Sequence, residues 1–193
     1  MFNFHSFFIY SFITTFTPGP NNITSMSYAA RLGLRNSYRF NLGIFIGFFI
    51  VMFSCSVFSS TLLNYIPKVR IYMVSIGSAY MLYLAWKILK SSFEVEIEKN
   101  GKASFSSGVL LQFINPKLYV YAITVMTLYV LPVFDSYWIL AGFSFFLALM
   151  AISSTFVWAF FGELFHKLPS KYTLAINSVM SLLLVYCAVS LFF

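Results

Sequence analysis

The run F-T-P-G-P-N-N at residues 16–22 places two prolines and a glycine inside a long uncharged segment, residues 1–30. Each proline removes a backbone N–H donor and clashes with the preceding turn, so a regular helix cannot continue through this run. In hydrocarbon, an unpaired backbone group costs several kcal/mol. The break must therefore be buried in protein or face a polar cavity, which Asn21 and Asn22 are suited to line.

The rest of the chain consists of apolar segments separated by charged residues. Of the 193 residues, 60% are hydrophobic and 9% are charged, against about 25% charged in soluble domains. This composition excludes a soluble globular domain. The uncharged segments are residues 1–30, 40–67, 71–86, 118–134, 136–162 and 172–193. We expect an all-α membrane protein with six transmembrane helices, because barrel strands would alternate apolar and polar residues and these segments do not.

Lys and Arg residues are distributed unequally among the connections between these segments. Nine lie in the first, third and fifth connections, whereas the second has only Lys68 and Arg70 and the fourth has none. Positive residues are retained in the cytoplasm. The odd-numbered connections are therefore predicted to be cytoplasmic and both termini to lie on the opposite side.

A polar linker divides the chain into two halves of three helices each. Because three is odd, the second half must enter the membrane with the opposite orientation, which is the arrangement of an inverted repeat. We expect a single transmembrane domain over residues 1–193, with repeat one at about 1–90, a cytoplasmic linker at about 91–107 and repeat two at about 108–193.

The first helix of each half carries a proline break at a matched place. Helix four contains F-I-N-P-K at residues 113–117, which corresponds to the break in helix one. Pro20 can begin a new half-helix whose free amides and positive dipole end attract a carboxylate. Asparagine oxygens, including that of Asn115, can accept hydrogen bonds from a substrate ammonium. The paired breaks therefore predict a binding site for an amino acid.

The depth of Lys117 depends on where helix four begins, and the sequence leaves two alternatives. If the helix begins near Gly108, Lys117 lies about 14 Å deep and adds a positive charge to the cavity. If it begins near Phe113, the ammonium reaches the cytoplasmic headgroups.

The few acidic residues limit the kind of substrate. No Asp or Glu occurs in residues 1–93, and neither Asp135 nor Glu163 falls at mid-membrane. A cationic substrate would need an anion in a site of low dielectric, so neutral zwitterions are favoured. Glu163 and Lys117 are the only candidates for coupling transport to protons.

The amino-acid composition disfavours several other classes of function. With 5 Asp and Glu and 2 His, an enzyme, a metal site or another cofactor site is not expected. The basic residues are scattered, which argues against a nucleic-acid partner and for a lipid bilayer. Cys55 and Cys187 lie one in each half, away from the breaks, and suggest a membrane thiol-disulfide electron carrier as an alternative function. A non-transporting membrane subunit is a third hypothesis.

Four motifs resemble those of the LysE/RhtB family of bacterial amino-acid exporters. They are F-T-P-G-P-N at 16–21, the paired glycines Gly43 and Gly47, G-S-A-Y-M-L-Y-L-A-W-K at 77–87 and F-I-N-P-K at 113–117. L-L-L-V-Y-C-A-V at 182–189, with T-P-G-P-N-N-I and A-W-K-I, is similar to the cysteine and O-acetylserine exporter branch.

The resemblance implies a multi-pass protein of the bacterial inner membrane, so the termini that the Lys and Arg distribution places outside the cytoplasm are expected to be periplasmic. It further implies export of small amino acids driven by the proton gradient, and assembly as a homodimer. Carried over by position, the substrate-binding residues are Thr17, Pro18, Gly19, Pro20, Asn21, Asn115, Pro116 and Lys117. Asn22 joins them as a cavity-lining candidate.

Overall fold

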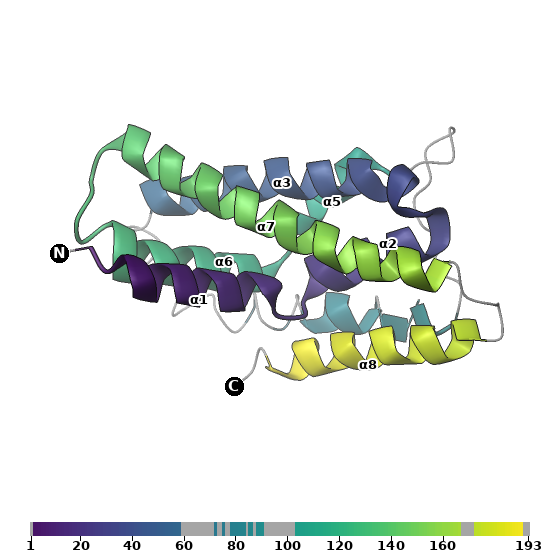
Figure 1. Ribbon diagram of the computed structural model, residues 1–193. Coiled ribbons are helices and arrows are strands. Elements are labelled where there is room, and N and C mark those ends of the chain that lie inside the picture. Colours follow the sequence, from purple (N-terminus) through teal and green to yellow (C-terminus); the bar gives the residue numbers. More distant parts are fainter. Residues whose placement is uncertain are drawn as a thin grey trace.

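The computed structural model describes residues 2–58, 72, 75, 78–83, 85–86, 88–90, 103–166 and 172–190. Over these residues the chain is almost entirely helical (Figure 1). The helices are α1 (Phe4–Phe16), α2 (Pro20–Leu32), α3 (Leu34–Val57), α5 (Phe105–Phe113), α6 (Pro116–Val125), the π-helical turn η1 (Met126–Val130), α7 (Tyr137–His166) and α8 (Thr173–Ser190). The prediction of an all-α protein is confirmed. Parts of predicted helix three (residues 71, 73–74, 76–77 and 84) and most of the linker lie outside the described residues.

Two long antiparallel helices form the centre of the bundle. α3 and α7 are long and apolar enough to cross a membrane, with mean hydropathy of 2.1 and 2.0. α5 and the following α6–η1 segment together count as a third candidate span, bent by 63° at the break between them. α8 is apolar but shorter.

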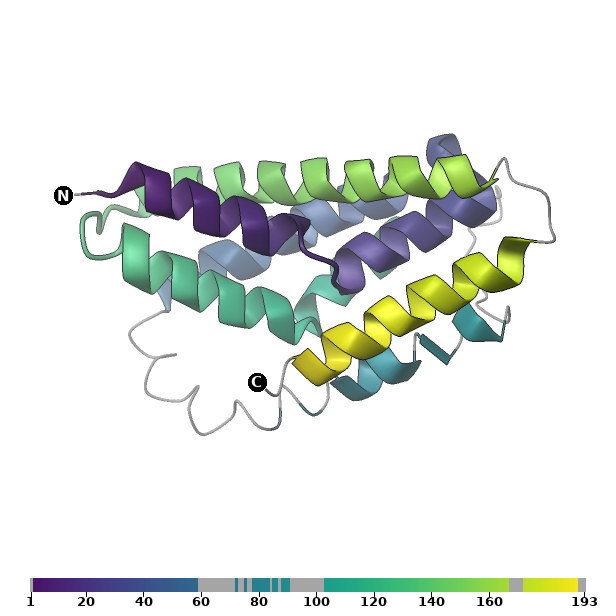
Figure 2. The same cartoon turned by 60° about the horizontal axis from the view of Figure 1, so that its bottom comes forward.

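The helix pairs α1–α2 and α5–α6 run in opposite directions along this bundle, and both are interrupted near its middle (Figure 1). α1 ends at Phe16 and α2 begins at Pro20, whereas α5 ends at Phe113 and α6 begins at Pro116. In Figure 2 the two interruptions lie close together, with α6 beside α1 and α8 beside α2. α5 begins at Phe105, three residues before Gly108, the predicted start of repeat two.

Glycines allow the helix backbones to approach closely. A Cβ added to Gly43 of α3 would lie 2.1 Å from the carbonyl oxygen of Phe105, and one added to Gly108 of α5 would lie 2.2 Å from that of Phe40. Gly162 of α7 packs in the same way against Met26 of α2. α5 is therefore held against α3, and α2 against α7, without room for a side chain at these points.

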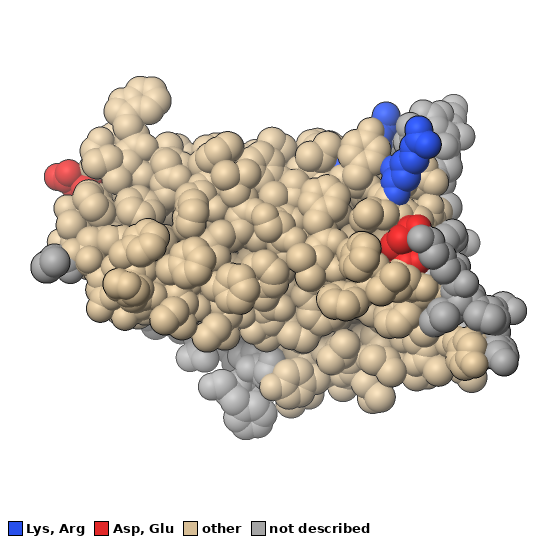
Figure 3. All heavy atoms as spheres, viewed as in Figure 1, with Lys and Arg blue, Asp and Glu red and all other residues tan. Residues whose placement is uncertain are grey.

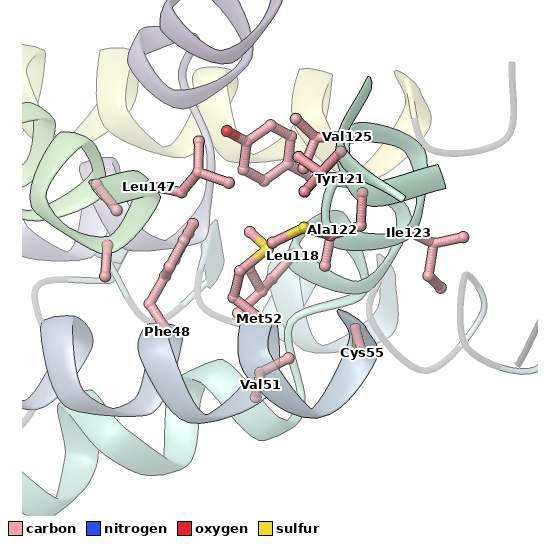
Figure 4. Close-up of a cluster of buried hydrophobic side chains, with 14 of the residues drawn as sticks. Phe48, Val51, Met52, Cys55, Leu118, Tyr121, Ala122, Ile123, Val125 and Leu147 are labelled. Carbon is pink, nitrogen blue, oxygen red and sulfur yellow. The ribbon is translucent and has the colours of Figure 1, made fainter. Parts of the chain in front are cut away.

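The largest buried apolar cluster fills the space between α3, α6 and α7. Phe48 and Met52 of α3 meet Leu118 and Tyr121 of α6 and Leu147 of α7 (Figure 4). All five side chains are at most 4% exposed. This cluster forms one wall beside the helix breaks.

The surface suits a lipid environment. The face in Figure 3 is uncharged between its two ends, and its Lys and Arg side chains gather at one end. Large apolar side chains such as Phe160, Leu128 and Trp138 are exposed along the helices. An uncharged apolar belt between charged ends is expected of a membrane protein.

Candidate substrate site at the helix breaks

The break between α1 and α2 follows directly from its sequence. Thr17 precedes Pro18 and adopts an extended backbone (φ −60°, ψ 141°), as residues before proline tend to do. Pro20 is the first residue of α2, a position where its missing N–H costs nothing. Gly19 is buried, and an added Cβ would lie 3.1 Å from Lys117 Nζ. Glycine at this position therefore lets the lysine cross over the chain.

The carbonyl groups released at the end of α1 are paired with side chains from other elements. Asn22 Nδ2 donates to Thr15 O and Thr17 O, both at 3.0 Å. Ser154 Oγ of α7 donates to Thr15 O at 3.0 Å, and Trp158 Nε1 donates to Phe16 O at 3.2 Å. The break is thus embedded in protein through polar contacts rather than left against lipid.

Lys117 joins the second break to the first. Its ammonium donates to Thr17 O at 3.1 Å and to Pro18 O at 3.2 Å. The Cys187 thiol of α8 donates to the same Pro18 carbonyl at 3.1 Å. The sequence-based placement of both cysteines away from the breaks is therefore wrong for Cys187. Periodicity along one helix could not reveal that α8 packs across α2 in this region.

The second break brings three side-chain amides together. Asn21 and Gln112 form a reciprocal pair: Asn21 Nδ2 donates to Gln112 Oε1 at 2.8 Å, and Gln112 Nε2 donates back to Asn21 Oδ1 at 3.0 Å. Asn115 Nδ2 donates to the same Asn21 oxygen at 3.1 Å. These three residues, which we call the amide cluster, link the start of α2 to the break before α6.

Both half-helices begin at the same cavity. Its lining includes Gly19, Pro20, Asn21 and Asn22 at the start of α2, and Asn115, Lys117 and Leu118 at the start of α6. Each helix has proline in its first turn, and neither N-cap residue, Gly19 of α2 or Asn115 of α6, caps its helix through a side-chain hydrogen bond. Two positive helix ends and a lysine ammonium therefore converge on one space, which favours an anion there.

The remaining walls of the cavity are hydroxyl-bearing and apolar. They are formed by Thr14, Thr15, Phe48, Tyr121, Ala151 and Thr155. The volume open to the centre of a water molecule is about 40 Å³, enough for roughly three waters at about 10–15 Å³ each. The Oδ1 atom of Asn115 is buried and has no hydrogen-bond partner among the described residues. This oxygen atom is therefore suited to accept a hydrogen bond from a molecule bound in the cavity.

The structure gathers most of the sequence candidates at this cavity. Six of them line it: Gly19, Pro20, Asn21, Asn22, Asn115 and Lys117. Thr17 and Pro18 do not line the cavity, but their carbonyl oxygens accept hydrogen bonds from the ammonium of Lys117, which does. Pro116 is buried and starts α6 without being part of the lining.

The coupling candidate Glu163 lies elsewhere, at the end of the bundle where α2 turns into α3. Its Oε2 atom accepts a hydrogen bond from Leu34 N at 2.6 Å, in the first turn of α3. The side chain therefore supports the start of that helix, where negative charge is favourable. It does not reach the central cavity in this structure.

Several residues of the site were not identified from the sequence. Gln112 is the most informative, because it is the only glutamine of the chain and is completely buried. A lone amide inside an apolar run, four residues before a proline break, was the available signal. The hydroxyl side chains of Thr14, Thr15, Tyr121 and Thr155 carried no such signal, since serine, threonine and tyrosine are frequent throughout the membrane segments.

Replacing Gln112 by leucine should destabilise the protein, because it leaves the side-chain amide of Asn21 without its buried reciprocal partner. We expect a loss of about 1–3 kcal/mol, or a fall in Tm of about 3–10 °C, measured on the detergent-purified protein. Ser178→Ala is the control, because that exposed hydroxyl bonds to Leu174 O of its own helix. Equal melting temperatures for the two variants would contradict a stabilising amide cluster.

Comparison with known proteins identifies related chains over almost the full length. The model of a family described as LysE type translocator matches residues 12–193. Cysteine/O-acetylserine efflux proteins of Escherichia coli K12, Shigella flexneri serotype 5b and Shigella sonnei are each 37% identical over 188 residues, covering 97% of this chain and 96% of theirs. No solved structure matches the chain.

Proposed function

The chain belongs to the family of LysE type translocators, which are transporters rather than enzymes, and we propose that it exports small neutral amino acids of the cysteine and O-acetylserine type. The observation that carries the proposal is the convergence of two uncapped helix N-termini and Lys117 on one central cavity. The relatives named as cysteine and O-acetylserine efflux proteins support the direction of transport and the kind of cargo.

The carboxylate of the cargo binds between the starts of α2 and α6. Lys117 directs two hydrogen bonds to the carbonyls of Thr17 and Pro18, and an ammonium has three donors, so one remains for the carboxylate. The free amides in the first turns of both helices supply further donors. Inside a membrane, where the dielectric constant is low, these contacts are stronger than they would be in water.

The ammonium of the cargo is bound by neutral oxygen atoms. Asn115 Oδ1, the buried acceptor with no described partner, is suited to this role. Of the described residues that line the cavity, none is acidic. A second positive charge on the cargo would therefore lack a counter-ion, which excludes lysine-like amino acids on energetic grounds.

The residues that form the walls of the central cavity limit the size of the cargo. The narrow space between Phe48, Tyr121 and Ala151 accommodates short side chains, and the hydroxyls of Thr15 and Tyr121 suit a small polar or thiol group. Even a small amino acid exceeds the open volume, so the cavity widens when cargo enters. Opening to either face requires the half-helices to move relative to α3 and α7.

The transport cycle is alternating access in a protein with six membrane-spanning helices. α1–α2 and α5–α6 are the broken first spans of two inverted three-helix repeats, and the cavity lies at the interface of the repeats. The basic end of the bundle faces the cytoplasm, and both termini are periplasmic. The proton gradient drives export, with Lys117 as the coupling group at the cavity.

Release of amino acids from loaded vesicles tests the proposal. Proteoliposomes are loaded with cysteine, serine, lysine or leucine, and a proton gradient is then imposed. Cysteine and serine should be released in a protein-dependent manner. The initial rate of lysine release should be at least about tenfold lower than that of cysteine or serine. Retention of all four amino acids, or preferential release of lysine, would contradict the proposed cargo.

The same assay distinguishes amino-acid transport from the alternative function, a membrane thiol-disulfide electron carrier. The Cys55→Ser/Cys187→Ser double variant keeps a donor for Pro18 O but has no thiol. It should release cysteine at a rate within about twofold of the unmodified protein. Loss of release in the double variant would favour the electron-carrier alternative instead.

A further inference from the structure

A second cavity lies at the basic end of the bundle, between α2, α7 and α8. It is lined by Ser27 and Arg31 of α2, Phe165 of α7, and Ile176, Asn177 and Met180 of α8. The volume open to water centres is about 200 Å³, compared with about 40 Å³ in the central cavity. The two cavities share no lining residue, so this space is distinct from the site described above.

The chemistry of this second cavity suits a small zwitterion. Arg31 contributes a guanidinium, which binds carboxylates through paired hydrogen bonds. Ser27 and Asn177 are 2% and 7% exposed and add neutral polar groups. The cavity also adjoins the last turn of α2, whose negative dipole end favours an ammonium. Of the described lining residues, none is acidic.

The position of the cavity connects it to the central site. Pro20 and Arg31 lie at opposite ends of α2, about 17 Å apart at about 1.5 Å per residue. Between them, α2 buries the small polar residues Thr24, Ser25 and Ser27. Ser25 Oγ lies within hydrogen-bond distance of Asn41 Oδ1 (2.6 Å) and of Thr155 O (3.0 Å), and Thr155 also lines the central cavity. Polar groups thus continue along α2 from one cavity toward the other.

From this arrangement we propose that the second cavity is a cytoplasmic vestibule, in which Arg31 binds the carboxylate of the amino acid before the cargo moves along α2 to the central site. The proposal rests on the proposed function, because it needs the basic end to face the cytoplasm and the cargo to carry a carboxylate. It adds a second substrate site, with lower affinity than the first. Apolar contacts from Phe165, Ile176 and Met180 accept the short side chain of the cargo.

Efflux kinetics test the vestibule directly. Arg31→Gln should raise the internal cysteine concentration needed for half-maximal efflux by about tenfold or more, since one charge-assisted contact is lost. The maximal rate should stay within about twofold, because the central site is intact. Arg35→Gln is the matched control: it removes an equal charge from the same end, at an exposed position outside the cavity. Similar kinetics for the two variants would overturn the proposal.

A second variant guards against a folding defect in Arg31→Gln. Asn177→Asp places a negative charge in the cavity and leaves Arg31 in place. It should also raise the half-maximal concentration, by repelling the carboxylate and by pairing with the guanidinium. An unchanged half-maximal concentration in Asn177→Asp would overturn the vestibule even if Arg31→Gln fails to fold.

Binding of radiolabelled cysteine separates the two sites. In Lys117→Gln protein, reconstituted in nanodiscs of phosphatidylcholine, weak binding near one cysteine per chain should remain and should disappear on adding Arg31→Gln. Complete loss of binding in Lys117→Gln alone would overturn the second site while leaving the proposed function intact. Efflux that is unaffected by Lys117→Gln would instead remove the proposed central site.

An anionic lipid headgroup shares the chemistry that Arg31 recognises. Reconstitution with and without phosphatidylglycerol distinguishes the two sources of the anion. A substrate site predicts the Arg31→Gln defect in both kinds of vesicle. A defect confined to vesicles that contain phosphatidylglycerol would assign the cavity to lipid and overturn the proposal.

Discussion

Replacing Lys117 by glutamine is expected to reduce amino-acid efflux by at least about 100-fold, because breaking a buried charge pair costs about 3–5 kcal/mol. Glutamine can still donate a hydrogen bond toward the carbonyls of Thr17 and Pro18, so the variant removes the charge and keeps much of the contact that joins the two breaks. The measurement is the initial rate of cysteine release from proteoliposomes, normalised to the amount of inserted protein.

The matched control is Lys90→Gln. This exposed lysine lies 4.8 Å from the centre of the Trp86 ring and does not line the central cavity. Its removal changes the net charge by the same amount and should leave the efflux rate within about twofold. Efflux at the unmodified rate from Lys117→Gln would show that the carboxylate is bound elsewhere.

Substituting Gly43 by alanine is expected to lower Tm by about 3–10 °C, which corresponds to an overpacking cost of about 1–3 kcal/mol. The added Cβ would lie 2.1 Å from the Phe105 carbonyl oxygen, so α3 and α5 must separate. α5 carries Gln112, whose side chain also packs against Gly47 at 2.8 Å from an added Cβ. Separation of the helices therefore displaces the amide cluster, and efflux should fall together with stability.

Gly142→Ala provides the control on the neighbouring long helix. An added Cβ there meets nothing within 4 Å, and alanine is the better helix former. Its Tm should be unchanged or slightly higher in the same thermal-shift measurement. A similar fall in Tm for both glycine variants would mean that the close α3–α5 contact does not account for the effect.

The interrupted helices illustrate how far local sequence determines structure. Pro18 and Pro20 forbid a regular helix by their covalent structure, and this constraint acts in any environment. The end of α1 at Phe16 and the start of α2 at Pro20 follow from it, as does the start of α6 at Pro116. The general composition likewise determines that the chain is helical and lies in a membrane.

The partners of the interrupted segments could not be predicted in the same way. The carbonyls of Thr15, Phe16 and Pro18 are paired by groups from α2, α6, α7 and α8, at sequence separations of up to 169 residues. Such contacts depend on which helix faces pack together. Periodicity indicates an apolar face but not its partner, and in a membrane all faces of a helix are similarly apolar.

Gln112 and Cys187 show the consequence most clearly. Each lies in an apolar run, and nothing local distinguishes Cys187 from Cys55, which is a buried member of the apolar cluster between α3 and α6. Packing of α5 against Gly43 and Gly47 directs Gln112 to Asn21, and packing of α8 directs the Cys187 thiol to Pro18 O.

By itself, the sequence determined that this protein is a helical membrane protein with two proline breaks and very few acidic groups, since these properties depend on residue type and spacing alone. The tertiary structure decided that both breaks open onto one cavity, that Lys117 crosses Gly19 to reach the other half of the chain, and that a second cavity forms beside Arg31. The physical reason is that a binding site requires groups from distant segments to converge. That convergence is fixed by close packing between helices and by the hydrogen bonds that unpaired backbone groups must find.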